Sequence, residues 1–152
     1  MRKFTPIIDS REKKPFEFSP DWCNKPIITK LDTGDYSISG LTDLVAIERK
    51  MSTSEIAINM AESRFKNVLE RLKSYKYKAI VCEFSYSDVL RFPIGSGIPK
   101  YIKTRVTNNW MNAWLANIVL NYQIPVLYAD NQINANNLCF RLMKSAWELE
   151  QS

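Results

Sequence analysis

The sequence predicts an α/β domain in which helices flank a central mixed sheet. Short β-prone segments alternate with amphipathic patterns of helical period along the chain, and such alternation is typical of a mainly parallel sheet. Residues 36–39 and 44–47 are β-prone and flank a turn-rich segment, which indicates a β-hairpin. Residues 79–82 form a continuous apolar run, as expected for a strand buried on both faces. We therefore expect a mainly parallel sheet with an antiparallel hairpin at one side.

The composition is that of one globular domain with a basic charge balance. The 152 residues suffice for a hydrophobic core, and 45% of them are hydrophobic and 24% charged. The net charge of +5 favours a polyanionic partner such as nucleic acid. Histidine is absent, which excludes Ser-His-Asp catalysis, histidine-based nucleases and histidine-ligated zinc.

The cysteines and the hydropathy pattern indicate an intracellular protein. Cys23, Cys82 and Cys139 are too far apart for a Cys-x-x-Cys zinc site, and their odd number argues against a disulfide framework. The short apolar stretch after the basic start is no signal peptide, and no segment approaches the ~18 apolar residues of a membrane span. We expect no membrane association.

Before the hairpin, the chain is predicted to form two strands joined by an irregular connection. Residues 5–8 are β-prone and end at Asp9, an acid at the carboxyl end of a strand, where open α/β sheets bind their ligands. Three prolines make residues 13–26 an irregular connection. Residues 27–31 resemble a second strand that leads into the hairpin.

The hairpin at residues 34–50 is expected to bring two carboxylates together. If its turn is symmetric, the numbers of opposed residues sum to a constant, so Asp35 faces Glu48. Directly opposed residues hold their Cβ atoms about 4.5–5.5 Å apart, so both carboxylates can bind one divalent cation. Side chains alternate along a strand, so Lys50 points to the same side as Glu48 and Arg49 to the other.

Two acids and a lysine at one point form a phosphodiester-cleaving arrangement of the type D-x(n)-E-x-K. Asp35, Glu48 and the main-chain carbonyl of Arg49 are expected to hold Mg²⁺ or Mn²⁺, which prefer oxygen ligands. Lys50 would orient or deprotonate the attacking water, or stabilise developing negative charge. The Arg49 side chain would brace the site from the opposite face or reach an acid such as Asp9. The alternative interpretation is a surface hairpin with exposed salt bridges.

A helix is expected directly after the hairpin. Ser52 and Glu55 have the spacing of a capping box, with Ser52 as the N-cap. The helix is predicted to run to about Ser74. Its apolar positions follow helical spacing: Ile58, Ala61, Phe65, Val68, Leu69 and Leu72. Arg64 lies on the polar face close to the acids, where it is either a solvated side chain or a DNA contact.

The middle of the chain is predicted to hold a buried strand and a long loop. Glu83 ends the strand at residues 79–82, and a capping or ion-pair role and a functional role are both open for it. The loop at residues 84–99 includes one short helical turn near residues 87–91. Basic and aromatic residues that suit a nucleic-acid groove follow it: Lys100, Tyr101, Lys103 and Arg105.

The last third is predicted as helix, strand and helix. The first helix covers about residues 104–122 and carries the apolar stripe Val106, Trp110, Ala113, Trp114 and Ile118. Residues 125–129 form a strand, and Asp130-Asn131 turn the chain into the final helix. One side of that helix is apolar: Ala135, Leu138, Cys139, Leu142, Met143 and Ala146.

These motifs together resemble the XPF-family (excision-repair cross-complementation group four) nuclease domain. The resemblance is carried by IIDSRE at residues 7–12, GDYSI at residues 34–38 and IERK at residues 47–50. It continues through residues 63–84 and 124–143, and so covers nearly the whole chain. It is nearest to compact phage and bacterial members, which implies the cytoplasm or nucleoid of a bacterial or phage-infected cell.

The resemblance implies a restriction-endonuclease-like (PD-(D/E)XK) fold and metal-dependent cleavage of flap, fork or junction DNA to 5′-phosphate and 3′-hydroxyl ends. It implies one nuclease domain over residues 1–152 without a helix-hairpin-helix module. The implied catalytic residues are Asp9, Asp35, Glu48, Arg49 and Lys50. The implied DNA contacts are Arg11, Arg64, Lys100, Lys103 and Arg105.

Two features of the resemblance leave alternatives open. The family motif ends in an acid four residues beyond Lys50, where this chain has Ser54, with Glu55 next to it. A non-catalytic relative that binds branched DNA or a partner subunit is therefore one alternative, and an enzyme that cuts linear duplex is another. Full-length relatives dimerise, so Trp110, Trp114 and the last helix are candidates for a homodimer face, with core packing as the plainer interpretation.

Overall fold

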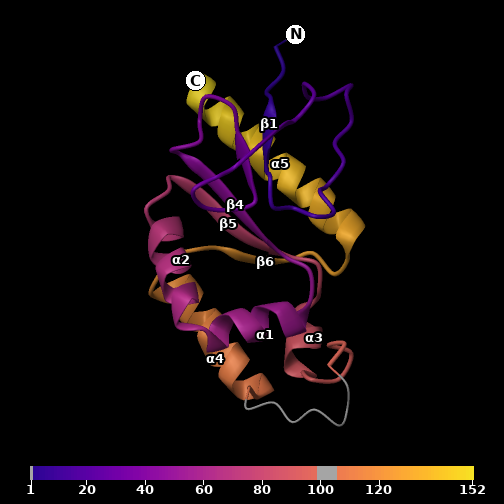
Figure 1. The fold of residues 1–152 in the computed structure, drawn as a ribbon, viewed down its shortest axis with the longest axis vertical. Helices are drawn as coiled ribbons and strands as arrows, with labels where there is room; N and C mark the ends of the chain where they lie inside the picture. The colour runs from indigo at the N-terminus through magenta and orange to yellow at the C-terminus, as the bar shows by residue number, and fades with distance from the viewer. Residues whose placement is uncertain (1, 99–105) are drawn as a thin grey trace.

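The structure is a computed structural model that describes residues 2–98 and 106–152 as one sheet with helices on both faces (Figure 1). The strands are β1 (Pro6–Asp9), β2 (Ile27–Thr29), β3 (Tyr36–Ile38), β4 (Val45–Lys50), β5 (Tyr77–Cys82) and β6 (Val126–Tyr128). The helices are α1 (Thr53–Ala61), α2 (Ser63–Lys73), α3 (Tyr86–Leu90), α4 (Asn108–Leu120) and α5 (Gln132–Gln151). In the part of the chain that is described, no helix is long and apolar enough to cross a membrane.

The sheet is mixed, as predicted, but its hairpin lies in the middle. The strand order is β2-β1-β3-β4-β5-β6. β3 pairs antiparallel with β4 and also with β1, and the remaining neighbours are parallel. The expectation of a hairpin at one side is therefore wrong. The reason is that β1 pairs with the free edge of β3, a long-range choice that the pattern within the hairpin does not reveal.

The two faces of the sheet carry separate cores, and β4 contributes to both. Val45 and Ile47 pack with α5 and the amino-terminal segment, whereas Ala46 packs with α1, α2 and α4. This alternation follows from the period of two along a strand. Glu48 and Lys50 continue the series of Ala46, so they belong to the face of α1 and α2 (Figure 1).

The helix predicted after the hairpin is broken into two. Glu62 is extended, with φ −95° and ψ 133°, and it both ends α1 and precedes α2. The break changes the phase of the apolar stripe, so Ile58 is 57% exposed although it was predicted to face the core. Before the break, the buried residues are instead Thr53, Ile56, Ala57 and Met60. After the break, Phe65, Leu69 and Leu72 are buried as predicted. A single period fitted across both helices could not place the first one correctly.

The predicted stripe of the next helix is confirmed at Ile118 but wrong at Trp110 and Ala113, which are exposed. Met111, Leu115 and Ile118 form the buried side of α4, whereas Trp110 is exposed and Trp114 only partly buried. Met111 and Leu115, and not the larger tryptophans, lie on the side of α4 that packs against the core. The stripe of α5 is essentially as predicted, with Phe140 as an additional buried member.

Candidate active site

The junction of β3 and β4 brings Asp35 to the site. Tyr36 pairs with Ile47, which is the predicted register. Gly34 has φ +82°, and a Cβ there would lie 3.2 Å from both the nitrogen and the oxygen of Ile47, so the position requires glycine. The N–H of Asp35 donates to the Ile47 carbonyl (2.8 Å), while its carbonyl accepts from the Asp9 N–H (2.9 Å). The Asp35 backbone therefore links β4 to β1 and leaves its side chain free to turn towards the pocket.

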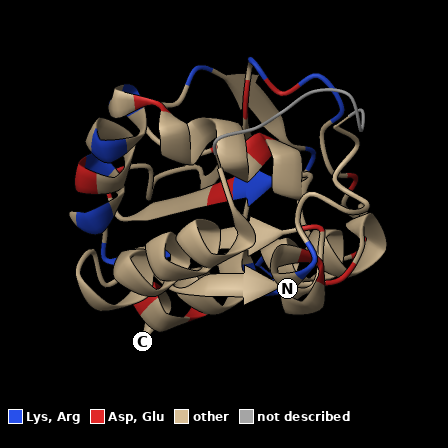
Figure 2. Ribbon diagram, turned by 90° about the horizontal axis from the view of Figure 1, so that it is seen from below, with Lys and Arg blue, Asp and Glu red and all other residues tan. Residues whose placement is uncertain are grey.

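A pocket of about 320 Å³ collects the predicted site residues on the α1 and α2 side of the sheet. Asp35, Glu48 and Lys50 line it, and Figure 2 shows acidic and basic residues following one another at the end of β4. Further lining residues are Asp9, Arg11, Asp32, Thr33, Gly34, Asn59, Glu62, Arg64, Phe65, Val68 and Arg71. The residues of three separate motifs therefore meet in one cavity, which the surface-hairpin interpretation does not explain.

Asp35 is a partly buried acid beside a second acid. Burial raises the pKa of Asp35 well above its usual value, and the negative charge of Glu48 raises it further. One carboxylate oxygen accepts the Arg49 N–H at 2.7 Å, which favours the ionised form but does not outweigh the other two effects. Two neighbouring carboxylates in a desolvated pocket are costly without a cation, and this is the property expected of a metal-binding pair.

Lys50 is nearly buried, 6% exposed, and is held by three oxygens. Its ammonium donates to Asn59 Oδ1 at 2.7 Å and to Glu48 Oε1 at 3.4 Å, and lies 3.8 Å from Glu55 Oε1. Asn59 makes the shortest of these contacts and was not among the predicted site residues. Its position one helical turn after Glu55, on the same side of α1, is the signal that points to it.

Arg49 lies on the opposite face of the sheet, as predicted. Its guanidinium donates to Glu83 at 2.6 Å and to Glu12 at 3.0 Å, and it lies 4.0 Å above the ring centre of Phe16. Asp9, one of the acids considered for it, is not its partner. Glu83 therefore has the ion-pair role, and Arg49 braces the strand from beneath while its main-chain N–H binds the carboxylate of Asp35 on the site.

Asp9 lines the pocket but is already paired. Arg11 Nε donates to it at 2.8 Å and the Leu31 N–H at 2.8 Å. Burial opposes its ionisation, but these hydrogen bonds outweigh burial and lower the pKa of Asp9. Its role in catalysis stays a prediction. The predicted DNA contacts Arg11 and Arg64 lie at the same pocket, Arg64 in an ion pair with Glu62.

The position of the missing motif acid is part of a helix cap. Ser54 Oγ lies 2.9 Å from Ser52 Oγ, and Ser54 does not line the pocket. Ser52 accepts the Glu55 N–H, as the capping box requires, but the Glu55 carboxylate accepts from the N–H of Met51 and not from that of Ser52.

The predicted DNA contacts Lys100, Lys103 and Arg105 lie outside the described residues.

The oxygen donors of the pocket fit a hard divalent cation. Within residues 2–98 and 106–152 no group of three or more Asp, Glu, Cys or His side chains surrounds a metal position. A cation in this pocket would therefore be held by Asp35, Glu48 and main-chain oxygen. The carbonyls of Leu44 and Lys50 accept from β5. Alternate residues of a strand bond to opposite neighbours, so the Arg49 carbonyl faces the Asp35 side.

The fold and this pocket define the class of the protein: a restriction-endonuclease-like α/β domain. The model of the ERCC4 domain matches residues 8–142, so the chain belongs to the ERCC4-domain family, and its domain is an XPF-family nuclease domain. No curated protein matches the sequence.

Two solved structures share the fold. XPF from Aeropyrum pernix is 20% identical with a TM-score of 0.66, and the match covers 93% of this chain and 64% of the XPF chain. A second structure of XPF from Aeropyrum pernix, in complex with DNA, is 21% identical with a TM-score of 0.67, and the match covers 96% and 66%. The chain thus spans just under two thirds of these solved chains.

Asp35→Asn should stabilise the protein at neutral pH. Because the pKa of Asp35 is raised, the folded state holds this proton more tightly than the unfolded chain, and stability falls as the pH rises above the ordinary value of 3.8. Asparagine removes the charge and keeps an acceptor for the Arg49 N–H. We expect a higher midpoint of thermal unfolding at pH 7 and a difference that shrinks as the pH falls towards 3.8.

Circular dichroism during heating measures this effect in metal-free buffer. Asp43→Asn, in the exposed turn of the hairpin, is the matched control and should change little. A variant at position 35 that is less stable than the parent at pH 7 would contradict the electrostatic account.

Glu83→Ala should destabilise the fold strongly. The side chains of Arg49 and Glu83 are 1% and 8% exposed, and removal of Glu83 leaves the buried guanidinium with Glu12 as its remaining carboxylate partner. Breaking such a pair costs about 3–5 kcal/mol, and urea unfolding measures it. The control is Glu148→Ala, which removes a pair to Lys144 that is 3.9 Å long and exposed. Equal effects of the two variants would show that Arg49 does not depend on Glu83.

Proposed function

We propose that the protein is a divalent-metal-dependent DNA endonuclease selective for flap, fork or junction DNA, leaving 5′-phosphate and 3′-hydroxyl ends. The observation that carries this proposal is the pair of carboxylates Asp35 and Glu48, both only partly exposed, beside Lys50 in one pocket. Membership of the ERCC4-domain family and the similarity to an XPF solved with DNA support it. Selectivity for branched DNA rests on the family resemblance alone.

Each residue of the pocket has a role in the proposed reaction. Asp35, Glu48 and the Arg49 carbonyl would hold Mg²⁺ or Mn²⁺, whose charge, when the ion is bound, offsets that of the phosphodiester during attack. Asn59 orients the Lys50 ammonium by accepting a hydrogen bond from it. The charge of Lys50 would stabilise the phosphate oxygens as negative charge develops on them. Arg11 and Arg64 contribute phosphate contacts that position the strand without reading its sequence.

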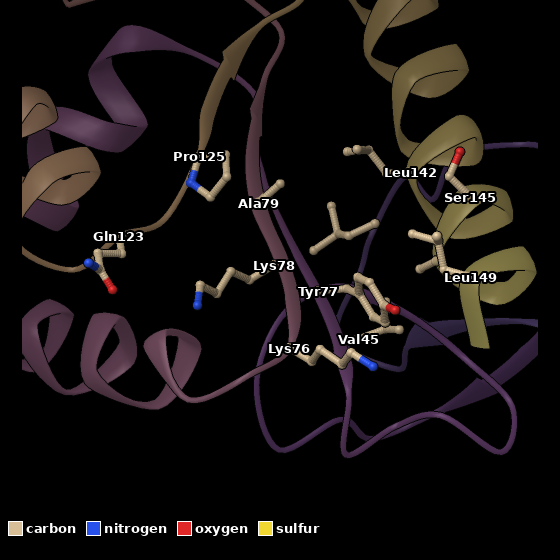
Figure 3. Close-up of a pocket in the computed structure, with 12 residues that line it drawn as sticks. Val45, Lys76, Tyr77, Lys78, Ala79, Gln123, Pro125, Leu142, Ser145 and Leu149 are labelled. Carbon is tan, nitrogen blue, oxygen red and sulfur yellow. The ribbon is translucent and has the colours of Figure 1, made fainter. Parts of the chain in front are cut away.

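We also propose that two copies associate through the C-terminal helices. A groove of about 450 Å³ lies between α5 and the strands β4 and β5, with Leu142 and Leu149 on one side and Ala79 and Pro125 on the other (Figure 3). Leu120 at the end of α4 is 79% exposed. Apolar surface of this kind is typical of contact regions between subunits. An intracellular site of action is part of the same proposal.

A non-catalytic protein that binds branched DNA is the second candidate. It is favoured by one observation: Ser54 takes the place of the motif acid, and its hydroxyl is hydrogen-bonded to that of Ser52, the N-cap residue of α1. Against it, the carboxylate pair and Lys50 are intact and converge. This candidate predicts DNA binding without metal-stimulated cleavage and without heat of Mg²⁺ or Mn²⁺ binding.

Asp35→Ala and Lys50→Ala should abolish cleavage. General acid–base and electrostatic groups each contribute about 10²–10⁴-fold to rates, so we expect a loss of at least about 10²-fold for each variant. Labelled flap, fork, junction and linear duplex DNAs are incubated with Mg²⁺, Mn²⁺ or EDTA. Asp43→Ala and Lys73→Ala are the controls. Activity equal to that of the parent in both site variants would sink the assignment, and cutting of linear duplex at a fixed sequence would select the duplex enzyme.

Asn59→Ala should lower the rate of cleavage without weakening DNA binding. Asn59 makes the 2.7 Å contact to the Lys50 ammonium, so its loss releases Lys50 towards Glu48 at 3.4 Å. We expect kcat to fall about tenfold, as for a lost hydrogen bond to a charged group, while KM changes less than twofold. Asn59→Asp keeps the acceptor oxygen and should recover most of the rate, and Asn67→Ala on the exposed side of α2 is the control. A change in KM alone would show that Asn59 contacts DNA and does not position Lys50.

A further inference from the structure

A second pocket, of about 310 Å³, lies on the α5 side of the sheet and is not used by the proposed nuclease reaction. Four cations and two tryptophans line it: Arg2, Lys3, Arg141, Lys144, Trp22 and Trp147. The nuclease residues Glu48 and Lys50 belong to the other face of the sheet. Figure 1 shows α5 and the amino-terminal segment at one end of the molecule and α1 at the other.

The cations of this pocket are largely uncompensated. Arg2 and Arg141 have no ion-pair partner among residues 2–98 and 106–152. Lys3 donates to the Pro20 carbonyl at 2.9 Å, which orients the ammonium but leaves its charge unpaired. Lys144 faces Glu148 only at 3.9 Å in an exposed pair, and such pairs contribute little. With Asp21 as the one carboxylate among the lining residues, the pocket attracts anions.

Trp22 offers an aromatic surface that is already in place. Its side chain is 63% exposed, although tryptophan side chains are highly buried on average. The Trp22 N–H donates to the Ser19 carbonyl at 3.1 Å and closes a turn. Two residues further on, the side-chain amide of Asn24 donates to the Lys3 carbonyl. The ring packs against Phe140 with centroids 5.8 Å apart. Trp22 is therefore supported from below and open above.

We propose that this pocket binds an unpaired segment of single-stranded DNA. An aromatic face among phosphate-binding cations is the usual arrangement of single-strand sites, in which bases stack and cations track the backbone. A duplex does not fit this chemistry, because its bases are stacked on one another and expose no face to Trp22. A pocket of about 310 Å³ is at the lower end of the about 300–1,000 Å³ of ligand sites, which suits one base rather than several.

The cations on α5 fit the phosphates that flank such a base. Arg141 and Lys144 are three residues apart and lie on the same side of the helix, while Lys3 and Arg2 line the pocket from the amino-terminal segment. This pocket and the catalytic pocket lie on opposite faces of the sheet. The DNA strand bound here is therefore a different one from the strand in the catalytic pocket. The proposal concerns binding alone and does not depend on nuclease activity.

The test is binding of a fluorescein-labelled oligothymidine to the full chain in EDTA, followed by anisotropy. Trp22→Ala should weaken binding at least about fivefold, the low end of the loss of one base–aromatic stack. Arg141→Gln with Lys144→Gln should reduce the slope of log K against log salt by about 1.4, since each phosphate contact on a single strand contributes about 0.7. Trp110→Ala and Lys73→Gln, away from the pocket, are the controls and should leave both quantities unchanged.

Two further measurements assign the contact to this pocket. Oligothymidine with 5-iodouracil should photocrosslink to Trp22, identified by mass spectrometry, and Trp22→Phe should keep most of the affinity. Thermal unfolding checks that Trp22→Ala is folded. Unchanged affinity in both pocket variants, or crosslinks confined to the catalytic face, would overturn the proposal. Polyglutamate binding with the same dependence on Trp22 would also overturn it, in favour of an acidic protein partner. Loss of cleavage in the Asp35 variant with binding intact separates this site from the nuclease.

Discussion

The contacts of Arg49 hold the candidate site together. Its main-chain N–H binds the carboxylate of Asp35, and its carbonyl faces the same side. On the other face of the sheet, its guanidinium is locked by Glu83 and Glu12. A residue fixed at both ends cannot rotate about the strand axis, so the neighbours Glu48 and Lys50 keep their direction towards the pocket. The ion pair under the sheet therefore determines geometry above it, which explains why a buried arginine stands between two residues of the site.

The site is electrostatically costly in the absence of a cation. Asp35 lies beside Glu48, and burial together with the charge of Glu48 raises the pKa of Asp35. Lys50 compensates only in part, and its shortest contact is to Asn59. A protein that optimised stability alone would have an amide or an apolar residue at position 35. On the proposed function, a bound cation would relieve this unfavourable energy, which is the trade-off between stability and activity expected at a functional site.

The features that the sequence predicted correctly are local ones. The Tyr36–Ile47 register and the division of Glu48 and Lys50 from Arg49 follow from strand period and turn symmetry, and the family resemblance added the fold. The errors arise where distant parts decide. The hairpin lies in the centre because β1 pairs with β3. The break at Glu62 depends on how α1 and α2 meet the sheet, and no single periodicity contains that information. Helical spacing from Glu55 places Asn59 on the right side of α1, but its contact with Lys50 depends on how α1 packs on β4.

The same sheet that unites the catalytic residues also separates two kinds of charged surface. On the α1 side, acids are gathered at a cavity rimmed by Arg11 and Arg64, so an anionic strand is attracted to the rim and tolerated at the centre only with a cation. On the α5 side, Arg141 and Trp22 lie at a pocket whose lining cations outnumber its single acid, so an anionic strand needs no cation there. Binding at the first surface should therefore depend on divalent metal, and binding at the second should not. The proposed nuclease site and the proposed single-strand site would then hold two different strands of one branched substrate.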